Sequence, residues 1–211
     1  MVKKGLLITV LMLVCVGVVM AQENKATTTE QGNNNLSAIV QEGGNQVATV
    51  TQVDDRNDAD VDQFTDNLGV QTATVLQNGD ATGKNTATIQ MDQFGGGNAT
   101  SNSAYIEQLG DYNTSFQKVY APGYNGGQDV WGSQKGNRNE LKQQILGGHT
   151  DNFTAEQTGN YNDAEQKMPS GSHSSGKVTQ VGDRNDAYQF LNGANNGYSA
   201  APKGGPVTVE Q

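Results

Sequence analysis

The chain has 211 residues, of which 34% are hydrophobic and 27 are Gly, and its formal net charge is −9. An ordinary domain of this length carries more aliphatic residues, so a conventional large apolar core is excluded. The acidic balance also argues against nucleic acid as a partner, because binding a phosphate backbone needs a basic face. Low hydrophobicity with high charge is typical of disorder, but here the apolar residues recur at regular positions, which argues for a fold.

The first 21 residues have the features of a secretory signal peptide. Lys3 and Lys4 form a positive start, residues 5–19 are apolar, and small residues ending at Ala21 form a cleavage site. A membrane anchor is the alternative, but the apolar stretch is short for a span and polar sequence follows it at once. The only cysteine, Cys15, lies inside this segment, so the mature chain has no thiol chemistry. We therefore expect a secreted protein at the cell surface or outside the cell.

Residues 22–34 show no apolar periodicity and are predicted to be a flexible leader, with a short strand at Thr27–Gln31 as the alternative. From Asn35 to the end at Gln211, small apolar and amide side chains alternate with polar ones. A strand places every second residue on one face, so this pattern predicts strands with one apolar face. About fourteen such segments can be counted.

Short turns rich in Gly, Asn and Asp separate the predicted strands, for example Lys135–Arg138 and Val181–Arg184. Gly and Asn tolerate the positive φ that tight reversals need. Longer connectors lie between other strands in the C-terminal half, and they contain all four prolines, which is where proline belongs if the remaining segments are hydrogen-bonded strands.

The unit Gln-x-Gly-x-x-Asn-x-Ala recurs along the chain. Residues 52–59 and 180–187 are nearly the same peptide, and the spacings from Gln134 to Gln157 and from Gln157 to Gln180 are both 23 residues. A fixed period in this range indicates a repeat architecture. We therefore predict an all-β fold, a β-solenoid of about seven stacked two-strand rungs, because one such unit cannot bury its apolar face alone.

Stacked rungs bring equivalent residues about 4.8 Å apart, and amide side chains can then hydrogen-bond in rows along the stack. The residues predicted to form these self-assembly ladders are Gln41, Gln52, Asn57, Ala59, Gln63, Gln77, Gln93, Gln108, Asn113, Gln134, Asn139, Gln157, Asn162, Ala164, Gln180, Asn185, Ala187 and Gln211. No polar capping helix is visible at either end, and open strand edges template further strands. The chain is expected to join copies of itself end to end.

The repeat follows a signal peptide and has a period of 22–23 residues, and in both respects it resembles the curlin repeat of bacterial curli subunits. Gln52, Asn57, Ala59 and Gln63 match that pattern, although Asp54 replaces its Gly. The resemblance implies an extracellular functional amyloid of the biofilm matrix, acting in adhesion as a major, minor or nucleating subunit. It also implies, as partners, other curli-type subunits, a dedicated outer-membrane secretion pore, and abiotic or host surfaces.

No catalytic, cofactor-binding or metal-binding set stands out, and we expect a protein that is not an enzyme and needs no cofactor. His149 and His173 lie in connectors without a ligand partner at a metal-binding spacing. The acidic run Asp54–Asp62 offers oxygen ligands for calcium, but strand alternation also simply points Asp58, Asp60 and Asp62 into solvent.

Outward aromatic residues such as Tyr105, Phe116 and Trp131 are consistent both with binding to surfaces and with ordinary packing on an exposed sheet. The alternative to a fibre subunit is a soluble monomeric β-solenoid that binds polysaccharide or ice through a flat face. An ice-binding face needs a regular outward row of one residue type, usually Thr, and the outward residues here are mixed.

Overall fold

In the computed structural model the chain is an all-β protein. The structure describes residues 23–65, 70–79, 83–93, 102–120, 128–147, 151–172, 175–194 and 207–210. The strands are β1 (Lys25–Gln31), β2 (Leu36–Glu42), β3 (Gln46–Val53), β4 (Asp58–Thr65), β5 (Gln71–Asn78), β6 (Thr86–Gln93), β7 (Asn102–Leu109), β8 (Thr114–Tyr120), β9 (Gln128–Lys135), β10 (Glu140–Ile145), β11 (Asp151–Thr158), β12 (Asp163–Ser172), β13 (Ser175–Val181), β14 (Asp186–Ala194) and β15 (Val207–Glu210).

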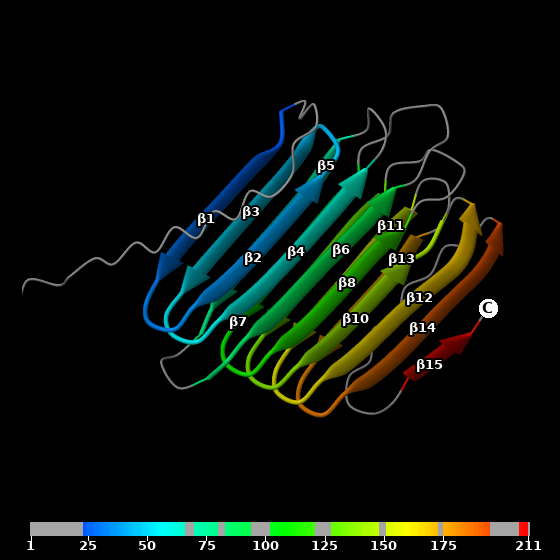
Figure 1. Ribbon diagram of the computed structural model, residues 1–211. Coiled ribbons are helices and arrows are strands. Elements are labelled where there is room, and N and C mark those ends of the chain that lie inside the picture. The colour runs from blue at the N-terminus through cyan, green and yellow to red at the C-terminus, as the bar shows by residue number, and fades with distance from the viewer. Residues whose placement is uncertain are drawn as a thin grey trace, which may run out of the picture.

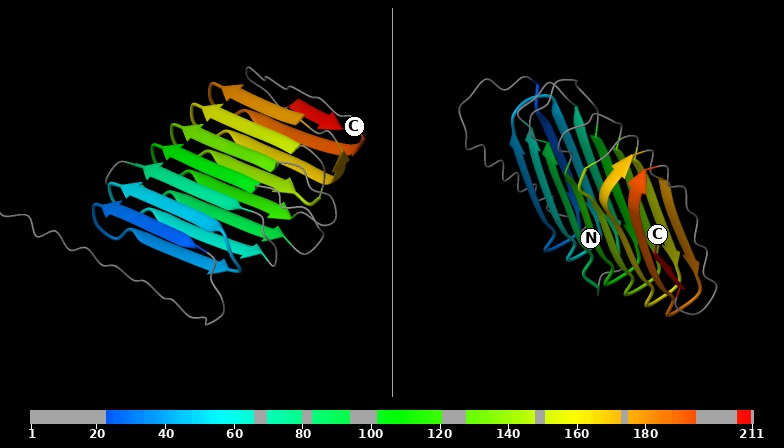
Figure 2. Two further views of the ribbon diagram at one scale, coloured as in Figure 1. Left: turned by 90° about the horizontal axis from the view of Figure 1, so that it is seen from above. Right: turned by 90° about the vertical axis from the view of Figure 1, so that its right-hand side faces the viewer.

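The strands form two parallel sheets that face each other (Figure 1). The odd sheet has seven strands in the order β1-β3-β5-β7-β9-β11-β13, and the even sheet has eight in the order β15-β14-β12-β10-β8-β6-β4-β2. Each odd strand and the even strand after it form one rung, and Figure 2 shows the rungs stacked along one axis. The predicted β-solenoid is confirmed, with seven complete rungs and β15 as an additional half rung.

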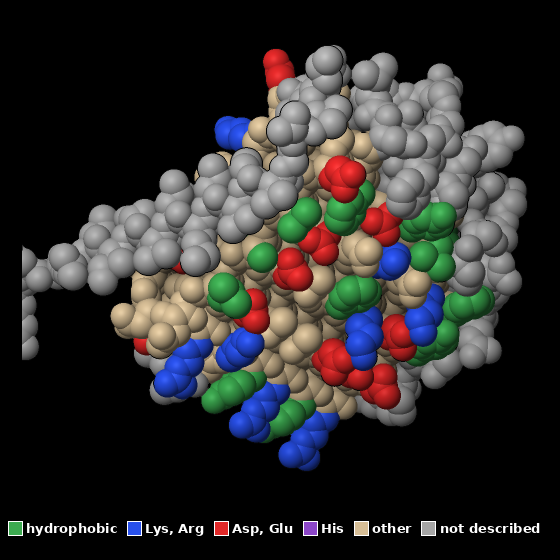
Figure 3. Space-filling model, viewed as in Figure 1, with side chains coloured by type: hydrophobic (Ala, Val, Ile, Leu, Met, Phe, Trp, Pro, Cys, Tyr) green, Lys and Arg blue, Asp and Glu red, His purple; other side chains and the backbone are tan. Residues whose placement is uncertain are grey.

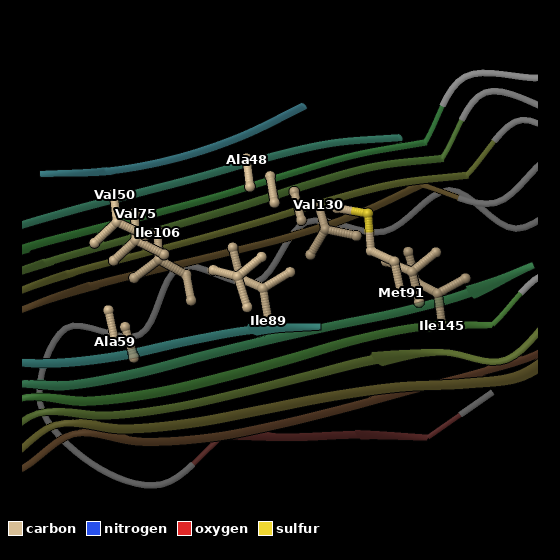
Figure 4. Packing of buried hydrophobic residues seen from close by; sticks show 14 of the residues in the cluster. Ala48, Val50, Ala59, Val75, Ile89, Met91, Ile106, Val130 and Ile145 are labelled. Atoms are coloured by element: carbon tan, nitrogen blue, oxygen red, sulfur yellow. The ribbon is translucent and has the colours of Figure 1, made fainter. Parts of the chain in front are cut away.

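Alternation of side chains builds the core. Strand β3, for example, buries every second residue, and its inward Ala48 and Val50 are fully buried. Figure 4 shows Val50, Val75 and Ile106 of the odd sheet pointing toward Ala59 and Ile89 of the even sheet. The small apolar residues of the repeat therefore lie between the sheets, as the alternation predicted.

The C-terminal half of the core is more polar. One inward column of the even sheet begins with Ile39, Val61 and Ile89, and then continues in register with Gln117, Gln143, Gln166 and Gln189. These four glutamines are buried. The apolar residues there separate into two clusters, the smaller of which is Leu141, Ala155, Ala164, Val178 and Ala187.

The alternative of a short strand within the leader, at Thr27–Gln31, agrees with the structure, which has β1 at Lys25–Gln31. Strand β1 pairs in parallel register with β3 from Lys25 to Gln31, so most of the predicted leader belongs to the first rung. Its sequence, Lys-Ala-Thr-Thr-Thr-Glu-Gln, has only one apolar residue and so lacks the alternation that marks the other strands. Backbone pairing to β3 holds it in place instead.

The two ends of the stack differ. The expectation of an open end agrees with the N-terminal rung, where inward Ser37, Ile39 and Gln41 remain partly exposed. At the C-terminal rung the inward Val178, Gln180 and Ala187 are buried, and β15 pairs with β14 along the edge of the even sheet. The C-terminal end is therefore not fully open, which corrects the expectation of two open ends.

Several predictions concern residues outside those that the structure describes. They are the signal peptide 1–21, His149, His173 and Gln211. Among the described residues, no helix is long and apolar enough to cross a membrane.

Candidate functional site: the side-chain ladders

The glutamine ladder is a continuous row of hydrogen-bonded amides in the odd sheet. In each step the Nε2 of one glutamine donates to the Oε1 of its equivalent on the next rung, over 2.8–3.0 Å. All members are at most 1% exposed. They are Gln52, Gln77, Gln108, Gln134, Gln157 and Gln180.

Each of these amides also ties the two sheets together. Gln134 Nε2 donates to the backbone oxygen of Thr114, the first residue of β8, at 3.0 Å. Gln180 makes the equivalent bond to Asp163 at 2.7 Å, and the other members repeat the pattern. One amide therefore bonds both along the stack and across the core, so a substitution removes both kinds of contact.

The asparagine ladder lies at the tight turn that precedes each even strand. Here the later rung donates: the backbone N–H of Asn139 bonds Asn113 Oδ1 at 3.0 Å, and Asn162 bonds Asn139 in the same way. The ladder contains Asn35, Asn57, Asn85, Asn113, Asn139, Asn162 and Asn185. Its donors point toward the N-terminal end, whereas those of the glutamine ladder point toward the C-terminal end, so the stack has a direction.

The turns themselves approach closely from rung to rung. Gly136 has a φ of 111°, and a Cβ added there would lie 2.1 Å from the backbone oxygen of Gly159. Gly182, with a φ of 105°, ends this series, and among the described residues a Cβ there would meet Asn185 Nδ2 alone, at 3.7 Å. Gly136 therefore has to be glycine both for its φ and for the space above it, whereas Asp54, with a φ of 68°, occupies the equivalent position in the second rung.

The structure brings most of the predicted ladder residues together, in separate columns. Ala59, Ala164 and Ala187 lie in one inward column of the even sheet. Gln41 and Gln63 form a short ladder of their own, with an amide bond of 2.8 Å, which ends because Met91 follows in register. Gln93 lies in β6, in register with Thr65.

Sequence reasoning missed a further buried polar column in the odd sheet, made of Gln46, Gln71, Asn102, Gln128 and Asp151. Each of these residues stands two positions before the first inward apolar residue of its strand. This constant offset of two positions could have identified the column from the sequence. It is hard to recognise because the residue type changes from strand to strand.

A column of basic and tyrosine side chains runs along the outside of the tight turns. Arg138 lies over the rings of Tyr112 and Tyr161, at 5.5 and 5.3 Å, and Arg184 lies 5.9 Å from the ring of Tyr161. Figure 3 shows basic and apolar side chains alternating along this edge. Each such contact contributes about 0.5–1 kcal/mol at an exposed site, which offsets the cost of a positive φ at non-glycine residues.

The outer face of the even sheet carries mixed charges, with acidic side chains spread over it (Figure 3). Burial and the neighbouring Asp58 raise the pKa of Asp60 above its ordinary value. Burial, with Asp60 and Asp92, does the same for the pKa of Asp62. Within the described residues, no group of three or more acidic, His or Cys side chains is arranged to hold a metal ion.

The outer face of the odd sheet is rich in threonine and carries an aromatic pair. Thr27, Thr49 and Thr74 follow one another in register, and Tyr105 and Trp131 continue the same column. The two rings stack with centroids 4.3 Å apart and planes within 5°. The regular threonine row is therefore interrupted by a flat aromatic surface.

No protein-family model, no curated protein and no solved structure matches the chain.

Proposed function

We propose that this protein is a secreted structural subunit of a curli-like extracellular fibre, which assembles by stacking copies end to end. The chain's own repeats already form the cross-rung pairing that such a fibre would continue from one copy to the next. The signal-like N-terminus and the resemblance of its repeat to curlin repeats support an extracellular location and a role in adhesion and biofilm matrix.

The observation that carries the proposal is the unbroken glutamine ladder with its fixed direction. Gln180 Nε2 is the donor end, and Glu30 occupies the equivalent position in the first rung, in register with Gln52. A carboxylate accepts but does not donate, so Glu30 of a second copy suits the N–H groups of Gln180. The two ends of one chain are complementary in this column.

The ladder also predicts head-to-tail growth of a polar filament. A head-to-tail contact joins two different surfaces and does not close on itself when the repeat axis is straight, so it extends indefinitely. Copies of the chain are then the chief partners, with other curli-type subunits, a secretion pore and an external surface as further ones.

The direct test follows fibre mass with an amyloid-binding dye for the chain from residue 22 onward, alone and with a trace of preformed fibres. We expect unbranched fibres with the cross-β spacing of about 4.8 Å along their axis. Rapid growth without seed would indicate a nucleating subunit, and a long lag abolished by seed would indicate a main subunit. A chain that stays monomeric for days at micromolar concentration, even with seed, would contradict the proposal.

Gly182→Ala tests whether the stack itself is the contact. Within one copy the added Cβ lies no closer than 3.7 Å to a described atom, so its cost there is the strain of an alanine at a φ of 105°. In a continuing stack it would also meet the next turn, as a Cβ on Gly159 would meet Gly182, at 2.1 Å. We expect the variant to fold as a monomer, to add to a growing fibre through its normal N-terminal end, and then to stop growth. Val181→Ala, a change at an exposed neighbouring side chain, is the matched control and should leave growth unchanged.

A soluble polysaccharide-binding β-solenoid is the second candidate, and the Tyr105–Trp131 stack favours it. A flat, partly exposed aromatic surface beside Thr72, Thr74 and Asp129 suits contact with a sugar ring. Interruption of the threonine row disfavours an ice-binding surface. Retention of the monomer on an insoluble polysaccharide, lost in Trp131→Ala, would support this candidate.

A further inference from the structure

We propose that β15 is an intramolecular cap that occupies the place of an incoming copy and must leave before the C-terminal end can grow. This inference rests on the proposed function. It concerns the surface to which a second copy would bind, and it follows from the order of strands in the two sheets.

The position of β15 breaks the alternation of the solenoid. Along the chain the strands alternate between the two sheets, so the strand after β14 is expected in the odd sheet, next to β13. Instead β15 lies in the even sheet and pairs with β14, with Ala187 opposite Val207 and Phe190 opposite Glu210. Among the described strands β13 has no partner on its outer side, so the even sheet extends one strand further along the stack axis than the odd sheet.

This arrangement conflicts with a continuous stack. The first rung of a second copy consists of β1 and β2, joined by the tight turn at Gly32–Asn35, so both strands must sit at the same height. If β1 of that copy pairs with β13, its β2 belongs on β14, where β15 already lies. Full docking of a rung therefore requires β15 to be displaced.

Displacement is favourable because the cap is short. Strand β15 pairs four residues with β14, whereas β2 pairs seven residues with β4 inside the molecule. An incoming copy would also add the contacts of β1, which pairs seven residues with β3. A short strand at an exposed edge protects that edge from accidental pairing without forming a permanent barrier.

Burial and strand pairing at the two ends of the stack support a cap at the C-terminal end. At the N-terminal rung, Ile39 and Gln41 are only partly covered, and no described strand pairs outside β1 or β2. At the C-terminal rung, Ala187 and Gln189 are nearly fully buried and lie in register with β15. One end is ready to bind and the other is covered, which would keep a newly exported monomer from polymerising at once.

The test compares seeded growth of the chain from residue 22 with that of two altered chains. One carries Thr208→Pro and Val209→Pro, which removes two backbone N–H donors from β15, and the other ends at Ala194. Both should elongate faster by roughly fivefold to tenfold, the factor expected for about one net hydrogen bond of displacement. Thr208→Val keeps the N–H and favours a strand, so it should elongate at the wild-type rate or more slowly.

Hydrogen exchange on the monomers supplies the second measurement. Amides of residues 187–190 should exchange faster in the proline variant than in the wild-type chain, whereas those of β3 should not change. Equal growth of all four chains, or equal exchange at residues 187–190, would overturn the cap while leaving fibre formation intact. If neither the intact nor the shortened chain grows on seed, both the cap and the proposed function are wrong.

Discussion

Glu30 stands in register with Gln52 at the N-terminal end of the glutamine ladder, where every later rung has a glutamine. The Oε1 of Gln52 is buried and has no hydrogen-bond partner. Glu30 accepts a hydrogen bond from the hydroxyl of Ser37, at 2.7 Å. An ionised carboxylate has no proton to donate, so it cannot satisfy the oxygen of Gln52 as a glutamine would.

Glu30→Gln should therefore stabilise the monomer. The new amide can donate to Gln52 Oε1 while its oxygen still accepts from Ser37, and one satisfied buried acceptor is worth about 1 kcal/mol. Chemical denaturation at neutral pH measures the change in the free energy of unfolding. Glu42→Gln makes the same change in charge at an exposed position and should have almost no effect. Equal stabilisation by both variants would mean that charge, not the ladder, is responsible.

Gln134→Leu should destabilise the chain strongly at nearly constant side-chain volume. It removes the bonds that Gln134 makes with Gln108 Nε2, Gln157 Oε1 and the backbone oxygen of Thr114. Gln108 Nε2 keeps its bond to the backbone oxygen of Thr86. Each unsatisfied buried group costs about 1–3 kcal/mol, and partial replacement by other partners makes a total loss of about 3–5 kcal/mol reasonable. Thermal and chemical unfolding measure this loss.

Gln41→Leu is the matched comparison for Gln134→Leu. Gln41 is partly exposed at the open end and bonds only Gln63 along the stack, at 2.8 Å. Water replaces lost partners there, so the expected loss is below about 1 kcal/mol. Similar losses at the two positions would contradict the view that burial within a continuous ladder determines the cost.

Much of this fold follows from the sequence because alternation and turn residues act locally. The inward faces of β3, β4, β5 and β7 and the turn before Asn139 were all predicted. It was harder to predict which residues share a column, since the ladder partners Gln134 and Gln157 are 23 residues apart but Gln77 and Gln108 are 31 apart. Connectors of variable length absorb that difference, so register depends on pairing between strands and not on spacing.

The sequence was least informative at the two ends of the stack. Strand β1 is polar at nearly every position, so the sequence predicted its Thr27–Gln31 part only as an alternative to a flexible leader. Its backbone pairing with β3 decides between the two. The alternation predicted to run to the end of the chain covers β15, but the place of this strand in the even sheet depends on competition between two edges. The local signal is weak at both ends, because each feature is determined by contacts between residues far apart in the chain.

Mild acid should stabilise the monomer through the aspartates of the even sheet. Burial, followed by acidic neighbours, raises the pKa of Asp60, Asp62 and Asp163 in the folded chain. The folded state therefore binds protons more tightly than the unfolded state, and stability rises as the pH falls through the folded pKa values. The gain in the free energy of unfolding is complete once the pH has fallen to near 3.8, the ordinary pKa of an aspartate.

Unfolding midpoints measured from neutral pH down to about that value should show the gain from acid, and Asp62→Asn should reduce it. Glu156→Gln, which makes the same change in charge on the outer face of the odd sheet, is the control. If the wild-type midpoint falls steadily over this range, other groups outweigh these aspartates and the prediction is wrong.

Gly132 and Leu141 should be energetically coupled, because the large side chain of Leu141 in the even sheet packs against Gly132, which has no side chain, in the odd sheet. Leu141 stands in register with Ser115 and Ala164, and Gly132 with Ile106 and Ala155. A Cβ on Gly132 would lie 2.8 Å from Leu141 Cδ2 and 2.8 Å from Gln117 Nε2, so the ends of both side chains would have to shift. We expect Gly132→Ala to cost about 1–3 kcal/mol by overpacking and Leu141→Ala about 2–5 kcal/mol by leaving a cavity.

The double variant should lose less than the sum of the two single variants, by about 1–2 kcal/mol, because the new methyl group partly fills the space that Leu141 leaves. Unfolding by denaturant measures all three changes. Gly132→Ala combined with Val50→Ala is the control pair: Val50 lies on β3, three strands away from β9 in the odd sheet, so those two losses should simply add. Additive losses for Gly132 with Leu141 would show that the two residues do not compensate each other's volume.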